Sequence, residues 1–364
     1  MSAEPRVVIG VPVYNHAAYL EAALRSLLEQ TYRALAVIVI DDRSPDDSLA
    51  IAHRLAAEDR RVEVHVNERR LGMLGNTNRA FALARERHPR ADYWALGSDH
   101  DLWHPRFVET LVDLLERHPD ALLAYPLVER IDEHGRRYPG AKTPKAFDTL
   151  GVTSRFDRLG IAFRRMAAGN MVYGMFRAHA LDPMTIYRPV LVPDRLLLSE
   201  LALRGPFVAA PQPLWQRRFR GLADLERQRR AFFPEGAPRY ARLPWWLQHA
   251  GALTAAYVFD RGGEDAGLGR AGGARLVTAY LRMALTLRFR RRIARVRRWF
   301  RRYLPHRVAR RLAHRLIERH GEAAGMRLRA ILAAIKRRRR LSPLVDRTIL
   351  ARLDRRLQRS REHA

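Results

Sequence analysis

The chain of 364 residues contains no cysteine, and this absence excludes both a disulfide framework and a metal site built from thiolates. It also contains no uninterrupted apolar run of the roughly 18 residues that a membrane-spanning helix requires. The nearest candidate, residues 245–259, is shorter and includes Gln248 and His249. The amino terminus has an acid at Glu4 and no small-residue cleavage site after its apolar run, so we expect no signal peptide. These absences fit a protein of a reducing compartment that would meet a membrane only at its surface.

Acidic residues are scarce relative to basic ones, and the imbalance is concentrated near the carboxyl terminus. The net charge is +29, and residues 288–364 contain 27 Lys and Arg against 5 Asp and Glu. Within this segment apolar residues recur every three or four positions among arginines, namely Phe289, Ile293, Val296, Phe300 and Leu304. This spacing predicts a basic amphipathic helix, and the charge asymmetry suggests an anionic partner such as lipid headgroups or nucleic acid.

Strand-like and helix-like segments alternate through the amino-terminal part of the chain. Short apolar runs occupy 6–13, 34–40, 61–66 and 93–96, and helical patterns occupy 19–29, 44–59 and 73–86. Such alternation predicts an α/β fold with a parallel, doubly wound sheet, which binds its ligands beyond the carboxyl ends of the strands. Polar residues follow all four strand ends here: Tyr14, Asn15, Asp41, Asp42, Asn67, Asp99 and Asp101.

The pattern after residue 105 is less regular. We expect a strand at 170–177 and a helix at 193–205, and on that helix we place Glu200 in solvent. Arg217 and Arg218 are either surface charges or ligands for phosphate.

Four strings in order carry a family resemblance: "VVIGVPVYN", "IDDRSPDDS", "NERRLGMLGNTNRA" and "LGSDHDLWHPRFVE". Together they resemble family 2 of the glycosyltransferases over about residues 6–220. The resemblance implies a GT-A type, doubly wound, mostly parallel sheet, here followed by an α-helical basic carboxyl-terminal region. We expect a catalytic domain at 1–225, a connecting helical or loop region at 226–274 and a basic amphipathic tail at 275–364.

The resemblance also implies a nucleoside diphosphate-sugar as donor and specific residues that hold it. Pro12, Tyr14 and Asn15 match the loop that packs against the nucleoside, where Tyr14 would stack on the base. Asp42 matches the carboxylate that accepts a hydrogen bond from the base. Two further matches, Gly72 and Asn78, belong to the segment that approaches the nucleotide, although Thr77 stands where many relatives have an arginine.

A divalent metal, Mn²⁺ or Mg²⁺, is implied at the string "SDHD". Aligned on its acids, the family's DXD-type motif falls on Asp99 and Asp101, and Asp99 would also contact the nucleotide. Aligned on the Trp and Pro that follow, it falls on Ser98 and His100. We favour the two aspartates, because hard cations prefer carboxylate oxygens, and keep His100 as a ligand if the metal is manganese.

Asp194 matches the second acid of the helix start that carries the family's general base, and Pro193 replaces the first. The alternative for Asp194 is a helix cap. The resemblance thus implies an inverting transfer to an acceptor hydroxyl, and the basic tail suggests that the acceptor is a cell-envelope glycan or lipid-linked. The basic tail would dock the enzyme peripherally on the anionic inner face of the cell membrane, from the cytoplasm.

Two other classes of protein fit the sequence less well than the transferase. A nucleotidyltransferase would place a glycine-rich phosphate loop after the first strand, and "PVYNHAAY" is not glycine-rich. A nucleic-acid-binding protein with an inactive sheet domain would suit the charge, but the tail contains no recognisable nucleic-acid-reading motif.

Overall fold

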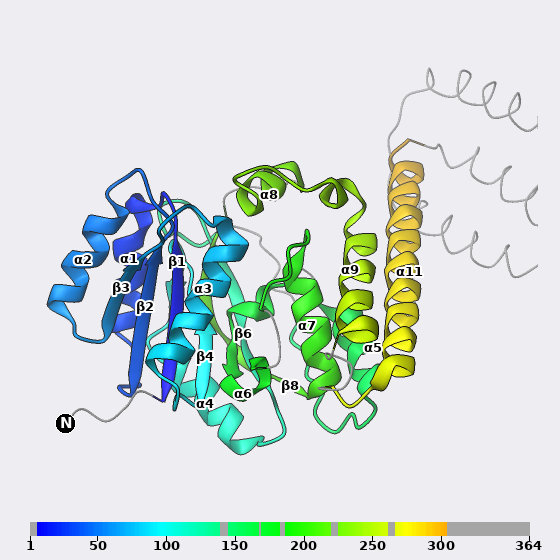
Figure 1. Ribbon diagram of the computed structural model, residues 1–364, viewed down its shortest axis with the longest axis horizontal. Coiled ribbons are helices and arrows are strands. Elements are labelled where there is room, and N and C mark those ends of the chain that lie inside the picture. Colours follow the sequence, from blue (N-terminus) through cyan, green and yellow to red (C-terminus); the bar gives the residue numbers. More distant parts are fainter. Residues whose placement is uncertain are drawn as a thin grey trace, which may run out of the picture. The chain divides into compact units, whose positions relative to one another are not determined.

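The computed structural model describes residues 6–138, 145–166, 169–182, 186–219, 225–260 and 266–303. The chain forms two compact units, residues 1–284 and 285–364. The first unit contains the sheet and the candidate site (Figure 1). Residues 289–303 of the predicted amphipathic helix fall on helix α11 (Gly269–Tyr303), and the rest of the tail lies outside the described residues.

A single sheet organises the first unit, and its described part has eight strands in the order β3-β2-β1-β4-β7-β6-β8-β5. The strands are β1 (Val7–Val13), β2 (Leu35–Asp41), β3 (Val62–Val66), β4 (Tyr93–Leu96), β5 (Leu102–Trp103), β6 (Leu123–Ile131), β7 (Met175–Arg177) and β8 (Phe207–Arg218). The first four strands are parallel to one another, whereas β7 runs antiparallel to both β4 and β6. The predicted mostly parallel α/β sheet is therefore confirmed.

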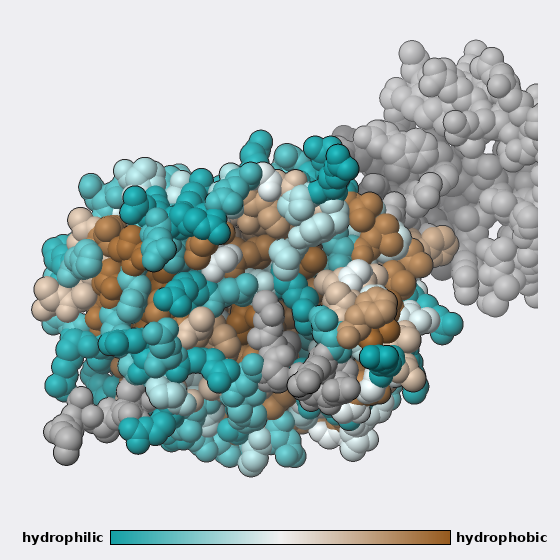
Figure 2. All heavy atoms as spheres, viewed as in Figure 1, coloured by the Kyte–Doolittle hydropathy of each residue, from teal (hydrophilic) through white to brown (hydrophobic). Residues whose placement is uncertain are grey.

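Helices cover both faces of the sheet. They are α1 (Ala17–Leu28), α2 (Ser48–Glu58), α3 (Gly72–Arg87), α4 (Phe107–Arg117), α5 (Arg155–Arg165), α6 (Ala178–Leu181), α7 (Pro193–Arg204), α8 (Leu225–Phe232) and α9 (Trp245–Thr254). Short helical turns η1 (Asn170–Tyr173), η2 (Arg239–Arg242) and η3 (Ala255–Phe259) connect them. Figure 2 shows hydrophilic residues over much of this face, with apolar residues exposed in several places, among them the area below α8.

The strands are buried on both faces because alternate residues of each strand enter different cores. In β1, Val7 and Ile9 pack with α1, α2 and α4, whereas Val8 packs with α3 and α7. A strand sandwiched in this way is apolar at nearly every position, which is the pattern seen at residues 6–13. Packing on both faces fixes the register, so the carboxyl ends of β1 and β2 meet with Val13 opposite Asp41.

The last part of the first unit is helical and belongs to the same packed body. Tyr280 of α11 is fully buried, and its ring lies 5.1 Å from that of Phe163 in α5. Leu276 and Ala284 are buried on the same helix. Within the described part of the chain, no helix is both long enough and apolar enough to cross a membrane.

Candidate active site at the carboxyl edge of the sheet

The loop after β1 is fixed by side chains from the loop after β2. The backbone N–H groups of Asn15 and His16 donate to the hydroxyls of Ser44 and Ser48, at 3.0 and 3.2 Å. Asn15 adopts a left-handed backbone (φ 57°), a conformation that asparagine tolerates better than most residues. Pro12 lies inside β1 opposite Ile40. The predicted nucleoside loop is therefore a rigid turn at the carboxyl edge of the sheet.

The carboxylate of Asp42 is buried and holds the start of α3. It accepts hydrogen bonds from the backbone N–H groups of Leu71 (2.7 Å) and Gly72 (2.8 Å), and from the side-chain amide of Asn67 (2.8 Å). The Asn67 amide also donates to the side-chain oxygen of Asn76, and the amide of Asn76 in turn donates to the carbonyl of Ile40. Three hydrogen bonds leave one of the roughly four acceptor positions of a carboxylate for a ligand.

Gly72 and Asn78 contact protein segments that the sequence did not place beside them. Gly72 has a φ of +73°, and a Cβ there would come within 2.7 Å of Pro234, just after α8. Figure 1 shows α8 close to one end of α3. Asn78 exchanges two hydrogen bonds with the backbone of Tyr187, at 2.8 and 2.9 Å. Gly72 thus permits the close approach of α3 and the segment after α8, and Asn78 bonds α3 to the segment that contains Tyr187.

The ring of Tyr14 is covered by an arginine that the sequence did not single out. The Cζ atom of Arg70 lies 3.9 Å from the centre of the Tyr14 ring, within the range of a cation–π contact. The only sequence signal was the pair Arg69 and Arg70 between a strand end and Gly72. One face of the Tyr14 ring therefore already carries a positive charge.

Asp99 lies under two histidines. Its Oδ2 atom lies 2.8 Å from Nδ1 of His16 and accepts the backbone N–H of Tyr14, and its Oδ1 atom lies 2.7 Å from Nδ1 of His100. Burial alone would raise the pKa of Asp99, but the hydrogen bonds with His100 and His16 outweigh it and hold that pKa well below the usual range. Asp99 is therefore an anion, and His16 is a neighbour that the sequence gave no reason to expect.

Asp101 faces a different set of partners. Its carboxylate is 3% exposed; Oδ2 accepts the indole N–H of Trp215 at 3.1 Å, and Oδ1 accepts the backbone N–H of Arg218 at 2.8 Å. Burial raises the pKa of Asp101. The two predicted metal ligands therefore share His100 as a neighbour, since its Nε2 atom lies 3.8 Å from Oδ1 of Asp101, but Asp101 also fastens β8 to the loop whereas Asp99 also faces His16.

The ligand atoms of His16, Asp99 and His100 all lie within 4.8 Å of one another. In the part of the chain that the structure describes, this is the one group of three or more acidic or histidine side chains with such spacing. Ser98 lies at its edge, with its hydroxyl 3.3 Å from Nδ1 of His100. A carboxylate and two imidazoles are donors that a divalent metal accepts, so this part of the loop fits the implied ion.

Asp194 lies in the first turn of α7, next to a strained residue. Val192, a β-branched residue, occupies the N-cap position with a left-handed backbone (φ 57°), so Asp194 is not the cap of this helix. Its Oδ1 atom accepts the hydroxyl of Tyr187 at 2.6 Å. Burial raises the pKa of Asp194, opposed by this hydrogen bond and by the charge of Arg217. A raised pKa suits a carboxylate that takes a proton at neutral pH.

The two arginines at the end of β8 have different roles. Arg218 is buried and donates to the carbonyls of His100 (2.9 Å), Asp132 and Glu133, so it supports the loop of residues 98–101, the acidic loop. Arg217 is half-buried, and its guanidinium donates to the side chain of Asn170 at 2.7 Å. The charge of Arg217 lowers the pKa of both Asp101 and Asp194, so it lies within electrostatic reach of both carboxylates.

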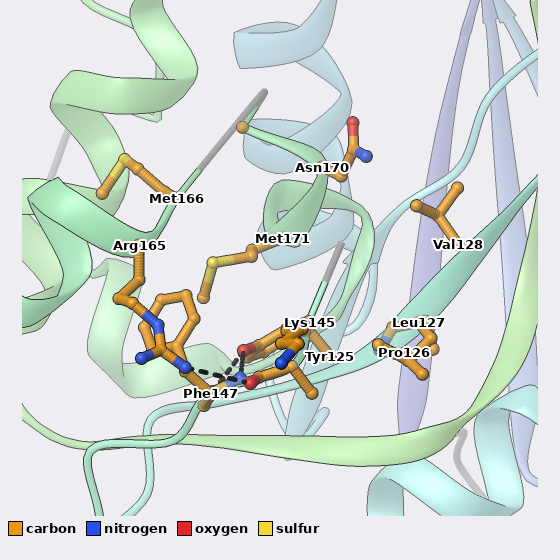
Figure 3. Close-up of a pocket in the computed structure, with 12 residues that line it drawn as sticks. Tyr125, Pro126, Leu127, Val128, Lys145, Phe147, Arg165, Met166, Asn170 and Met171 are labelled. Carbon is orange, nitrogen blue, oxygen red and sulfur yellow. Dashed lines mark hydrogen bonds between the residues drawn. The ribbon is translucent and has the colours of Figure 1, made fainter. Parts of the chain in front are cut away.

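A small cavity of about 40 Å³ is lined in part by Asn170, the hydrogen-bond partner of Arg217. Figure 3 shows its lining, where Arg165 lies beside the ring of Phe147 and Met171 points into the same space. The hydroxyl of Tyr125 is hydrogen-bonded to the backbone of Phe147 and closes one side. The cavity reaches Gly169, the residue packed against Asp194.

Comparison with known proteins finds a matching family and several relatives. The sequence profile of "Glycosyl transferase family 2" matches residues 8–173. The putative glycosyltransferase EpsE of Bacillus subtilis is 31% identical over 207 residues, which are 56% of this chain and 68% of EpsE. A Campylobacter jejuni protein named GalNAc(5)-diNAcBac-PP-undecaprenol beta-1,3-glucosyltransferase is 33% identical over 81 residues, or 22% of this chain and 26% of the relative.

Other curated relatives match this chain over only a minor part of their own length. The matched stretch spans 25% of the uncharacterized protein MT1568 of Mycobacterium tuberculosis, at 40% identity over 84 residues, which are 23% of this chain. Among solved structures, Staphylococcus aureus TarS 1–349 in complex with UDP-GlcNAc has a TM-score of 0.51 at 16% identity, covering 91% of each chain. At that identity the likeness supports the fold alone, which is the GT-A type.

Proposed function

This chain belongs to glycosyltransferase family 2, and we propose that it moves a sugar from a nucleoside diphosphate-sugar to an acceptor hydroxyl with inversion at the anomeric carbon. The observation that carries the proposal is the convergence of Tyr14, Asp42 and Asp99 at one edge of the sheet. These groups follow β1, β2 and β4, which are neighbours in the sheet. Ligands of doubly wound sheets bind at such an edge.

The donor's base binds between Tyr14 and Asp42. Tyr14 supplies a stacking face, and the last free acceptor position of Asp42 takes a hydrogen bond from the base. A base on the covered face of Tyr14 displaces Arg70, whose guanidinium then becomes available to the diphosphate. Arg70 thereby replaces the arginine that many relatives have at the position of Thr77.

The negative charge that develops on the leaving diphosphate is stabilised at the acidic loop. A divalent metal held by Asp99 supplies Lewis-acid stabilisation of that charge when bound. The second predicted ligand, Asp101, fixes β8 against the loop through Trp215 and Arg218. Arg217 adds a positive charge on the side of Asp194.

Asp194 is the general base of the proposed reaction. The acceptor oxygen attacks the anomeric carbon as the bond to the diphosphate oxygen breaks, and the hydroxyl proton passes to the carboxylate. Tyr187 holds the carboxylate through its 2.6 Å hydrogen bond, and Gly169 leaves room beside it. Attack from the face opposite the leaving group in one step gives inversion.

The acceptor is a lipid-linked or envelope glycan, and the basic tail brings the enzyme to it. The Campylobacter relative is named for an undecaprenol-linked acceptor, which supports this class. Each basic residue near an anionic surface contributes on the order of 1 kcal/mol. We expect the full chain to sediment with anionic vesicles and to bind them more weakly when 336–340 (KRRRR) are replaced by glutamine. Equal sedimentation with neutral vesicles would contradict docking by charge, and no sedimentation with either kind of vesicle would remove the membrane role.

The activity is tested by product identity. A transferase releases a nucleoside diphosphate from a nucleotide-sugar, whereas a nucleotidyltransferase releases pyrophosphate from a nucleoside triphosphate and a sugar phosphate. Incubating the full chain with both substrate types and identifying the nucleotide products by chromatography separates the two. Asp194→Asn should bind the nucleotide-sugar and fail to transfer the sugar, because the amide cannot accept the proton.

A further inference from the structure

The N-cap of α1 is occupied by a residue that does not cap it. His16 holds this position, yet its side chain makes no capping hydrogen bond. Instead, the helix start is held by other groups: Ser48 accepts the N–H of His16, and Asp46 accepts the N–H of Ala17 at 2.8 Å. N-caps are usually Ser, Thr, Asp or Asn, and departures from local rules concentrate at functional sites.

The imidazole of His16 is aimed at the acidic loop. Its Nδ1 atom lies 2.8 Å from Oδ2 of Asp99, and the His16 and His100 rings are 4.8 Å apart between centres. The Nδ1 atom of His100 meets the other oxygen of the same carboxylate at 2.7 Å. The ligand atoms of a first-row metal, each about 2.1 Å from the ion, lie about 3–4 Å from one another. The observed separations are 2.7 and 2.8 Å from the Asp99 oxygens to the two imidazoles, and all the ligand atoms lie within 4.8 Å of one another.

The donor set differs from the carboxylates that a DXD motif supplies. Mg²⁺ prefers oxygen ligands, whereas imidazole nitrogen suits first-row transition ions. Replacing a carboxylate by a neutral imidazole also removes one negative charge from the site. Asp101, the remaining acid of the loop, has its Oδ1 atom 3.8 Å from Nε2 of His100 and accepts hydrogen bonds from Trp215 and Arg218 of β8.

We propose that His16, Asp99 and His100 together bind the metal of this enzyme, and that the site selects a transition ion such as Mn²⁺ or Co²⁺ over Mg²⁺. The inference rests on the proposed function for the role of the ion, but not for its binding. His16 is contributed by the nucleoside loop, so the ion ties that loop to the acidic loop. A donor bound against Tyr14 is thereby held next to the metal.

Binding is measured without turnover by titrating the full chain with Co²⁺ and following its visible absorption. The wild type should bind one Co²⁺ that a hundredfold excess of Mg²⁺ does not displace. His16→Gln and His100→Gln should each weaken Co²⁺ binding at least tenfold, and Asp99→Asn should abolish it. His134→Gln is the matched control, since His134 is exposed and lies 3.6 Å from a single carboxylate, Glu133. Thermal unfolding confirms that each variant is folded.

A second measurement uses the wild type alone, in case a variant fails to fold. Pulsed electron paramagnetic resonance of bound Mn²⁺ should detect coupling to imidazole nitrogen. Absence of that coupling, Co²⁺ affinity unchanged in His16→Gln, or displacement of Co²⁺ by equimolar Mg²⁺ would each overturn the inference.

The two proposals fail in different ways. Selective Co²⁺ binding without release of any nucleoside diphosphate would leave the metal site standing and remove the transferase activity. Equal turnover with Mg²⁺ and Mn²⁺, unaffected by His16→Gln, would keep the activity and remove the three-residue site.

Discussion

The hydroxyl of Tyr187 donates a 2.6 Å hydrogen bond to Oδ1 of Asp194. Tyr187 is itself buried, and its backbone exchanges two hydrogen bonds with Asn78 of α3. A chain of hydrogen bonds therefore connects α3, through Tyr187, to the proposed general base Asp194. The position of that base depends on the segment between α6 and α7 as much as on α7 itself.

Removing the Tyr187 hydroxyl should shift the pH dependence of transfer. Its hydrogen bond favours the ionised carboxylate and so lowers the pKa of Asp194 from the level set by burial. In Tyr187→Phe that pKa rises further, and because the base acts when deprotonated, the acidic limb of kcat/KM against pH should move to higher pH. Tyr240→Phe, which loses a hydrogen bond to the carbonyl of Pro189, is the control. Superimposable profiles for wild type and Tyr187→Phe would contradict this role.

Replacing the proposed base should separate chemistry from binding. Asp194→Asn keeps the size and one acceptor oxygen for Tyr187 but cannot take up a proton. We expect kcat to fall about 10²- to 10⁴-fold, the usual contribution of a general base, while the affinity for nucleotide-sugar stays within a few-fold. Calorimetry gives the affinity and product release gives kcat. A variant with normal kcat would exclude Asp194 as the base.

Gly169 should be needed for activity beyond its backbone conformation. Its φ is +70°, and a Cβ there would come within 2.6 Å of Cβ of Asp194. Gly151 has a φ of +72°, and a Cβ there would meet nothing within 4 Å. Gly151→Ala should therefore destabilise the fold by about 1–2 kcal/mol through its backbone conformation alone, whereas Gly169→Ala should destabilise it more and also reduce kcat sharply. Equal activity in the two variants, compared at equal folded fractions, would refute the contact.

Stability should fall in mild acid because of His249. This residue is fully buried, with its ring nitrogens facing Leu191 and Tyr280, and burial lowers its pKa to about 4. The unfolded chain, with a pKa near 6.5, binds a proton at higher pH, so stability drops as the pH falls from about 6.5 to 4. This group accounts for about 3 kcal/mol over that window. Urea unfolding should show a shallower pH dependence in His249→Gln, and an identical dependence would contradict the assignment.

Much of the sheet could be predicted from the sequence because its strands are buried on both faces. Residues 6–13 and 34–40 are apolar at nearly every position, and the polar residues after them mark where the strands end. The expected strand at 170–177 was wrong in its first half, where η1 (Asn170–Tyr173) precedes β7. Gly169, with its positive φ, starts that turn, and apolar spacing does not report backbone conformation.

Contacts between distant segments could not be predicted. Glu200 was expected in solvent, and this was wrong: it is 1% exposed and paired with Arg188 at 2.8 Å, because α7 is buried around its whole circumference. His16 and Arg70 carried no periodic signal and gain their significance only from neighbours far along the chain. A motif aligned by its letters alone pairs Asp99 with Asp101, and it does not reveal that Asp99 also faces His16 whereas Asp101 also bonds to Trp215.

Cleavage of a nucleotide-sugar at the site that contains Asp99 is tested most directly by measuring the release of nucleoside diphosphate. The donors are a panel of UDP-, GDP- and dTDP-sugars, with and without Mn²⁺, and the proteins are wild type, Asp99→Asn and Asp101→Asn. We predict metal-dependent release from one donor by the wild type, its loss in Asp99→Asn, and its retention, with lower thermal stability, in Asp101→Asn. Release that is independent of metal and unchanged in Asp99→Asn would contradict this mechanism.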